Sequence, residues 1–271
     1  QSGFPNNSIK SIDKLTDEVL DSMGDPRNKA LPFLTKNLVV GDIQSGKTTT
    51  YLALANKAYD LGYSTVIIIA GRFNDLRIQT NLEADRMIVG RNTNESFPIP
   101  WIGVGKLANF PIGKKLFPRQ KGRHFELVRN YTSATKEGDF NGSDMKIFNR
   151  GLNILDEQEV KKLAVIKKEK SALQNVINAL KYQGAFSSNN PNNSGSILII
   201  DDEIDDGSMN TNTRDEDFDE NISPTTTNRL IREMLRVSSR CSYVGFTATP
   251  YAPSLIPIES EIELARFGED L

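Results

Sequence analysis

The stretch "NLVVGDIQSGKTTTYLALANKAYDLGY", residues 37–63, changes its pattern at a glycine and decides the fold class. The aliphatic run 37–40 predicts a short buried strand. After Lys47, apolar residues recur at helical spacing as far as Gly62, which predicts a helix that ends at that glycine. The segment between strand and helix satisfies G-x-x-x-x-G-K-[ST], in the setting that a phosphate-binding loop requires.

Such a loop predicts a site for the phosphates of ATP. Its backbone N–H groups and the helix N-terminus point at the phosphates, and the Lys47 ammonium reaches the β and γ oxygens. Thr48 supplies a hydroxyl to Mg²⁺. The alternative is a Gly-rich turn with an exposed lysine. The motif places these residues at the nucleotide: Gly41, Ser45, Gly46, Lys47, Thr48 and Thr49.

The stretch "ILIIDDEID", residues 197–205, predicts the second half of the same site. An aliphatic strand that ends in acidic residues puts carboxylates at the edge of the sheet where open α/β folds bind ligands. Asp202 is predicted to hold Mg²⁺, and Glu203 to orient and deprotonate the attacking water. Asp205 completes an Asp-Glu-x-Asp pattern. The alternative is a solvated acidic turn.

A third stretch, "YVGFTATPYA" at residues 243–252, predicts a strand followed by a turn. Small hydroxyl residues before a proline commonly just end a strand. In phosphate-loop folds, however, the strand after the acidic one lies beside the phosphate-loop strand. Thr247 and Thr249 are therefore predicted to lie near the γ-phosphate, and Thr249 is included among the catalytic residues.

The remaining patterns predict one domain with a mainly parallel sheet of doubly wound type. Residues 1–36 are predicted to be a helical lead-in and residues 37–271 the domain. Within it, 106–160 is predicted to be an insertion and 187–196 a mobile loop, because glycine, proline and polar residues interrupt every period there. Further predicted elements are strands at 64–71, 101–105 and 162–168 and a helix at about 74–87.

Composition predicts a soluble, cytoplasmic protein with no membrane partner. The chain has 271 residues, 38% of them hydrophobic, a net charge of −2 and no apolar run that spans a bilayer. Its only cysteine, Cys241, is predicted to be a buried thiol, and a zinc cluster is excluded. Residues 101–185 carry 16 basic side chains, whereas 201–220 carry 10 acidic ones. This segregation fits a polyanion-binding face beside a metal-nucleotide site, or two solvated surfaces.

The phosphate loop, Asp-Glu-x-Asp and Thr-Ala-Thr, in this order, resemble the first RecA-like lobe of superfamily-two helicases. A closer resemblance is to the Z-one domain of bacterial restriction and antiphage defence proteins. It rests on the motifs quoted above, on "IIIAGRFNDLRIQT" and on "LIIDDEIDDGSMNT", and it extends from about Thr16 to the C-terminus. The resemblance implies a three-layer RecA-like P-loop ATPase fold. It adds these residues to the candidate site: Gln44, Arg72, Asn74, Arg77, Gln79, Asn210 and Thr211.

The resemblance also implies partners. Residues 72–80 fall where helicases contact a nucleic-acid strand, although Arg77 has the alternative of an ion pair within the fold. Since no second lobe with an arginine finger is visible, a second RecA-like lobe or an oligomer partner is expected, and the chain is expected to be a fragment of a longer protein. Glu159 and Lys161 have the spacing of one nuclease class, but a charged patch explains them and endonuclease activity is not supported.

Overall fold

The computed structural model describes these parts of the chain: residues 6–28, 30–41, 46–93, 102–104, 128–141, 161–187, 195–206, 208 and 225–249. Along them, strands alternate with helices in the order that the sequence predicts for an α/β fold.

Six parallel strands form one sheet, in the order β1-β6-β5-β2-β4-β3. Strand β1, which precedes the predicted phosphate loop, lies next to β6, and β6 separates it from β5. The strands in that spatial order are β1 (Phe33–Val40), β6 (Arg240–Thr247), β5 (Ile197–Asp202), β2 (Thr65–Ala70), β4 (Lys161–Ile166) and β3 (Val128–Asn130).

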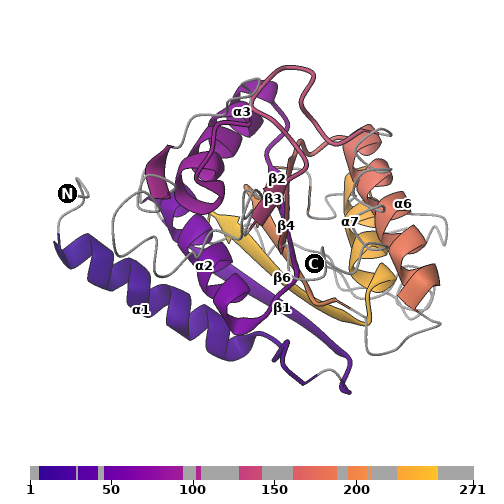
Figure 1. Cartoon of the computed structure of the whole chain (residues 1–271), viewed down its shortest axis with the longest axis horizontal. Coiled ribbons are helices and arrows are strands. Elements are labelled where there is room, and N and C mark those ends of the chain that lie inside the picture. Colours follow the sequence, from indigo (N-terminus) through magenta and orange to yellow (C-terminus); the bar gives the residue numbers. More distant parts are fainter. Residues whose placement is uncertain are drawn as a thin grey trace, which may run out of the picture.

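Helices cover both faces of the sheet, which makes a three-layer α/β fold of the RecA-like type (Figure 1). The first layer contains α1 (Asn6–Ser22), α2 (Lys47–Leu61), α3 (Asn74–Ala84) and the π-helical turn η1 (Asp85–Val89) that continues α3. The second contains α6 (Lys170–Ser187) and α7 (Thr226–Val237). The predicted fold class is therefore confirmed.

Strand β2 shows why the sheet strands are almost wholly aliphatic. All six of its residues are buried, since successive side chains point to opposite faces and helices cover each face. Val66 and Ile68 belong to the core under α2, whereas Ile67 and Ile69 belong to the core under α6 and α7.

Helix α2 follows the sequence prediction closely. Its buried residues include the predicted stripe of Tyr51, Leu54, Ala55, Ala58 and Tyr59. It ends before Gly62, whose φ of 116° lies in the left-handed region that favours glycine. The Gly62 N–H donates to the carbonyls that close the helix.

The N-terminal residues are less separate than predicted. Strand β1 begins at Phe33 rather than at residue 37, so the end of the predicted lead-in belongs to the sheet. Helix α1 packs along α2, where the Lys57 ammonium donates to the Asp13 carbonyl at 2.9 Å and pairs with Asp17 at 2.6 Å. The lead-in is thus part of the first helical layer.

The strand predicted at 101–105 is not formed by the residues that the structure describes there, and the predicted insertion and loop lie partly outside the described residues. Residues 102–104 form no strand, because Gly103 has a φ of 47° and the Ile102 N–H donates to Gly90. The predicted insertion contains β3, the short last strand of the sheet, and most of its remaining residues lie outside the described ranges, as do 188–194 of the predicted loop. Among the helices of the described ranges, none combines the length and apolarity that crossing a bilayer requires.

Candidate functional site at the carboxyl edge of the sheet

The carboxyl ends of the parallel strands gather the predicted site residues at one edge of the sheet. Val40, the last residue of β1, lies in register with Thr247, the last residue of β6. Asp202 ends β5, and its neighbour across the sheet is Ala70 at the end of β2. Parallel strands bring these ends together although they are separated by up to about two hundred residues in the chain, and ligands of such folds bind there.

The described ends of the predicted phosphate loop have the backbone that the motif requires. Gly41 follows β1, and its N–H donates to the Thr247 carbonyl at 3.0 Å, which ties the loop to β6. Gly46 has a φ of 76° and precedes Lys47, where α2 begins. The first N–H groups of this fifteen-residue helix therefore face the carboxyl edge. Gln44 and Ser45 lie outside the described residues.

Thr48 of α2 and Asp202 of the acidic turn both interact with the hydroxyl of Tyr51. The buried Tyr51 hydroxyl contacts the side chains of Thr48 and Asp202, and it lies 3.3 Å from the Thr80 hydroxyl of α3. Thr48 and Asp202, the two predicted Mg²⁺ ligands, are thus brought to one hydroxyl although they are 154 positions apart (202 against 48). Thr49, the residue after Thr48 in α2, is half-buried.

The electrostatics of Asp202 reflect this crowding. Burial raises the pKa of its carboxyl and the neighbouring Glu203 raises it further, whereas Lys47 and the Tyr51 hydroxyl act in the opposite direction. A cation at this carboxylate would relieve both unfavourable effects, because it supplies positive charge to a buried anion.

The donor set suits a magnesium ion. Mg²⁺ prefers oxygen ligands and keeps several waters, so one hydroxyl and one carboxylate from the protein are enough. The oxygens of Thr48 and Asp202 supply that pair. No group of three or more carboxylate, histidine or cysteine side chains that could hold a metal ion gathers within the described residues.

Asp205 joins the acidic turn to the end of β6. Its carboxylate accepts hydrogen bonds from the hydroxyls of Thr247 at 2.8 Å and Thr249 at 2.7 Å. Burial alone would raise the pKa of Asp205, but the hydroxyls of Thr249 and Thr247 outweigh burial and the net direction is downward. The threonines therefore hold the acidic turn, and whether they also contact a phosphate stays a prediction.

A buried lysine that sequence reasoning missed stands behind the acidic turn. Lys168 follows β4, and its ammonium lies 3.0 Å from the buried Asp201 carboxylate. It also donates to the backbone carbonyls of Asp202 at 2.8 Å and of Glu203 at 2.7 Å. Asp201 accepts a further hydrogen bond from the Tyr243 hydroxyl at 2.8 Å. The doubled lysine directly after a buried strand was the available sequence signal.

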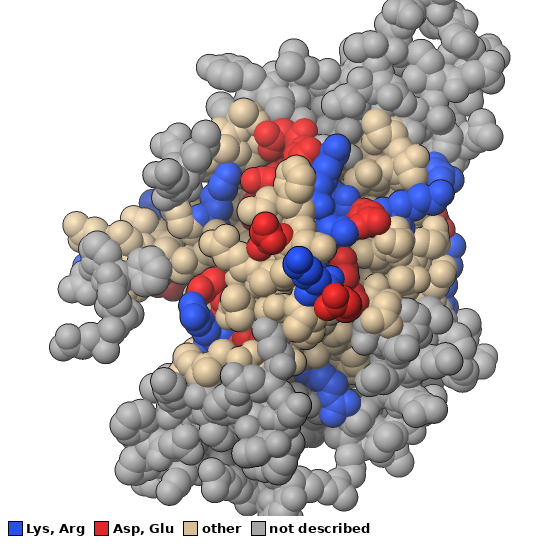
Figure 2. All heavy atoms as spheres, turned by 90° about the horizontal axis from the view of Figure 1, so that it is seen from above, with Lys and Arg blue, Asp and Glu red and all other residues tan. Residues whose placement is uncertain are grey.

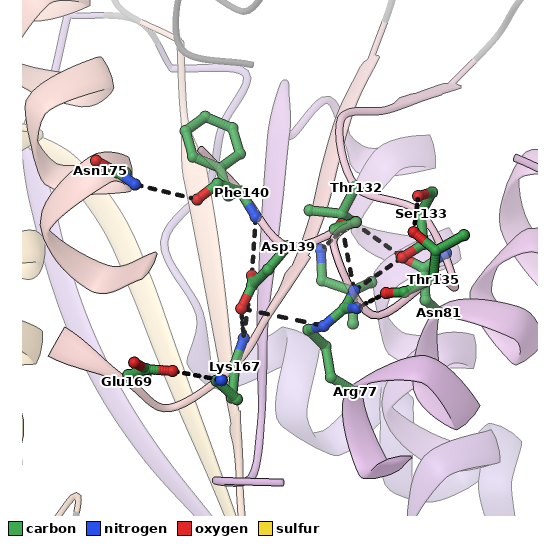
Figure 3. Close-up of polar contacts among 12 residues, drawn as sticks. Arg77, Asn81, Thr132, Ser133, Thr135, Asp139, Phe140, Lys167, Glu169 and Asn175 are labelled. Carbon is green, nitrogen blue, oxygen red and sulfur yellow. Dashed lines mark hydrogen bonds and ion pairs between the residues drawn. The ribbon is translucent and has the colours of Figure 1, made fainter. Parts of the chain in front are cut away.

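Arg77 is bonded within the fold, so the prediction that it contacts nucleic acid is not supported. The side chain is completely buried, and its guanidinium donates to the carbonyls of Ser133, Thr135 and Gly138 (Figure 3). Asp139 lies 4.0 Å from its Nε. The alternative of an ion pair within the fold is the one that the geometry supports.

The other candidate residues of the 72–80 segment, Arg72, Asn74 and Gln79, remain at least partly accessible. Arg72 is half exposed and pairs with Asp206 at 3.0 Å, next to the acidic turn. Asn74 begins α3 as a half-buried residue, and Gln79 is exposed on the same helix. The three are therefore free to meet a ligand at this edge, whereas Asn210 and Thr211 lie outside the described residues.

The described surface has no single sign of charge in the view of Figure 2. Basic and acidic side chains are interspersed over the described part of that face. Most of the residues in the basic 101–185 and acidic 201–220 segments lie outside the described ranges. The predicted polyanion-binding face thus stays a prediction.

Neither a scan against protein-family models nor a search of curated proteins gives a match to this chain. The resemblance to the Z-one domain therefore stays a prediction that rests on the quoted motifs. What the structure adds is that Thr48 and Asp202 interact with the same Tyr51 hydroxyl and that the charge of Lys47 acts to lower the pKa of Asp202, which burial raises.

Proposed function

We propose that the chain binds Mg²⁺-ATP at the carboxyl edge of the sheet and hydrolyses it. The observation that carries the proposal is that Thr48, at the start of α2, and Asp202, at the end of β5, interact with one hydroxyl, that of Tyr51. The charge of the neighbouring Lys47 acts to lower the pKa of Asp202, which burial raises, and Glu203 follows Asp202 directly. One cation, one hydroxyl and two carboxylates beside a helix N-terminus are what a phosphate ester and its metal require. A binding site alone needs no carboxylate beyond the metal ligand.

The chemistry assigns a role to each residue. Lys47 neutralises oxygens of the β and γ phosphates, and Thr48 and Asp202 hold Mg²⁺, which supplies further positive charge when bound. The Glu203 carboxylate accepts a proton from water as the water oxygen bonds to the γ phosphorus. The bond from that phosphorus to its bridging oxygen breaks, and ADP leaves with the electron pair while inorganic phosphate forms.

We further propose that this ATPase is the first lobe of a superfamily-two helicase-like motor. The resemblance to the Z-one domain supports a role in bacterial antiphage defence or restriction, on nucleic acid and in the cytoplasm. Completion of the site by a second RecA-like lobe or an oligomer partner belongs to the same proposal. The arginines of α7 are poor substitutes for an arginine finger, because Arg232 is buried and α7 packs against α6.

The second candidate is an ATP-binding regulatory module that recruits a protein partner or nuclease and hydrolyses very little ATP. One observation favours it. Phe73 is 69% exposed at the start of α3, and Leu76 on the next turn is also exposed, beside Arg72. An exposed aromatic ring near the nucleotide edge suits contact with an apolar protein surface.

Single-turnover hydrolysis separates the two candidates. Glu203→Gln keeps the shape of the side chain but removes the base, so we expect turnover to fall about 10²-fold or more while ATP binding persists. Glu18→Gln, on the exposed face of α1, is the matched control and retains wild-type turnover. If the wild type binds ATP without measurable hydrolysis, the regulatory module is the better account.

A further inference from the structure

We propose that Lys168 is a positioning residue that holds Glu203 in place for attack on ATP. The inference rests on the proposed function and deepens it. Lys168 does not reach the reacting atoms, since its ammonium is bonded to the back of the acidic turn. Its role is to fix the backbone from which the Glu203 carboxylate projects.

The recorded contacts of the Lys168 ammonium are all with the acidic turn and the end of β5. A lysine ammonium has three donors and no acceptor. Two hydrogen bonds go to the carbonyls of Asp202 and Glu203, and the ammonium forms an ion pair with the Asp201 carboxylate at 3.0 Å. The Lys168 side chain is completely buried. A buried charge persists only when it is paired and hydrogen-bonded in this way.

The backbone of Glu203 needs such support. Its φ of 53° is the one left-handed value at a non-glycine residue among the described residues. That conformation is strained for an ordinary residue, and it persists where neighbours over-determine it. Lys168 supplies one restraint on the Glu203 carbonyl, and the N–H of Asp206 supplies a second at 2.8 Å.

Gly71 links the same lysine to the side-chain end of Glu203. The Lys168 N–H donates to the Gly71 carbonyl at 2.7 Å. A Cβ atom placed on Gly71 would lie 3.5 Å from a carboxylate oxygen of Glu203, so that carboxylate lies against the glycine. Lys168 therefore contacts the Glu203 backbone through its ammonium and, through its own N–H, Gly71 directly after β2, against which the Glu203 carboxylate lies.

The test compares turnover with affinity in matched variants. Lys168→Met keeps the length of the side chain but removes the ammonium, and we expect its kcat to fall at least about tenfold while the ATP affinity stays within about twofold. Lys167→Met is the control, because the Lys167 ammonium pairs with Glu169 and does not reach the turn. Since Lys168→Met leaves Asp201 unpaired, the double variant Lys168→Met/Asp201→Asn provides a neutral pair if the single variant does not fold.

A double-mutant cycle with Glu203→Gln decides whether Lys168 acts through Glu203. We expect Lys168→Met to lower kcat less than about twofold once Glu203 is glutamine, because the base that it positions is already lost. A wild-type kcat in folded Lys168→Met, or an equal fall in both backgrounds, would overturn the inference and leave the ATPase proposal intact. A wild type that does not hydrolyse ATP would instead refute the proposed function, and the inference with it.

Discussion

Replacing Arg77 by methionine should destabilise the fold by about 3–5 kcal/mol, the cost of breaking a buried, hydrogen-bonded charge. Methionine retains much of the aliphatic stem, so the main loss is the guanidinium. That group donates to the Ser133 carbonyl at 2.8 Å, to the Gly138 carbonyl at 3.3 Å and to the Thr135 carbonyl. It is thus the anchor between α3 and the turn that follows β3.

The magnitude follows from these partners. A hydrogen bond to a charged group contributes about 1.5–3 kcal/mol, so three would exceed about 4.5 kcal/mol if all were lost without compensation. The turn, however, includes the exposed Glu137, so water can hydrogen-bond to some of the carbonyls that lose the guanidinium. Asp139 also loses a cation 4.0 Å away, although it keeps the backbone N–H groups of Phe140 and Lys167.

Urea unfolding followed by circular dichroism measures the change, with Arg86→Met as the control. Arg86 lies just beyond α3, but it is exposed, and among the described residues its ion pair is with Glu83 at 2.7 Å across one turn. Its replacement should cost less than about 0.5 kcal/mol. If Arg77→Met were within about 1 kcal/mol of the wild type, the guanidinium would not anchor the turn and a role in binding nucleic acid would be open again.

Three shorter predictions follow from other contacts. The pKa of Asp205 is lowered in the folded chain, so the stabilisation of the fold by its ionised carboxylate is present above the unfolded pKa of about 3.9 and is lost as pH falls through the folded pKa. The urea midpoint of Asp205→Asn should therefore drop less between pH 5 and pH 3 than that of the wild type. An equal drop would contradict the hydrogen bonds assigned to the Asp205 carboxylate. Burial raises the pKa of the Cys241 thiol to about 12, so a maleimide should label it in urea and not in the native protein, and rapid native labelling would refute its burial. If residues 106–185 contact the phosphates of nucleic acid, the affinity should fall as salt rises, and each neutralised phosphate should add about 0.7–0.9 to the slope of log affinity against log salt concentration. A flat profile would favour a protein partner.

The sequence predicted the parts of the fold where local pattern and burial agree. Strands β2 and β5 are aliphatic because they are buried on both faces, and α2 shows its apolar stripe and its terminal Gly62 directly. Strand β3 was not predicted, since three residues with an arginine in the middle are too few to show a periodicity and owe their pairing to β4.

The candidate site was predicted where one motif contains both the residues and their spacing. Lys47, Thr48, Asp202 and Glu203 were predicted in this way, and their role at a nucleotide stays a prediction. Lys168 was not, because a lysine in a charged run is typical of a solvated surface, and only the parallel pairing of β4 with β2 brings it behind the acidic turn. The burial of Arg77 likewise depends on a turn about 60 residues away in the chain, which no local pattern indicates.

Titration calorimetry with Mg²⁺-ATP on the wild type and on Lys47→Ala tests the central claim most directly. If the Lys47 ammonium neutralises the phosphates, the variant should lose at least about 2 kcal/mol of binding free energy, or about 30-fold in affinity. Lys57→Ala, ten residues farther along the same helix, should bind ATP as the wild type does, because Lys57 pairs with Asp13 and Asp17 of α1. Equal affinities for folded Lys47→Ala and wild type, or no binding by either, would contradict a nucleotide site at this edge of the sheet.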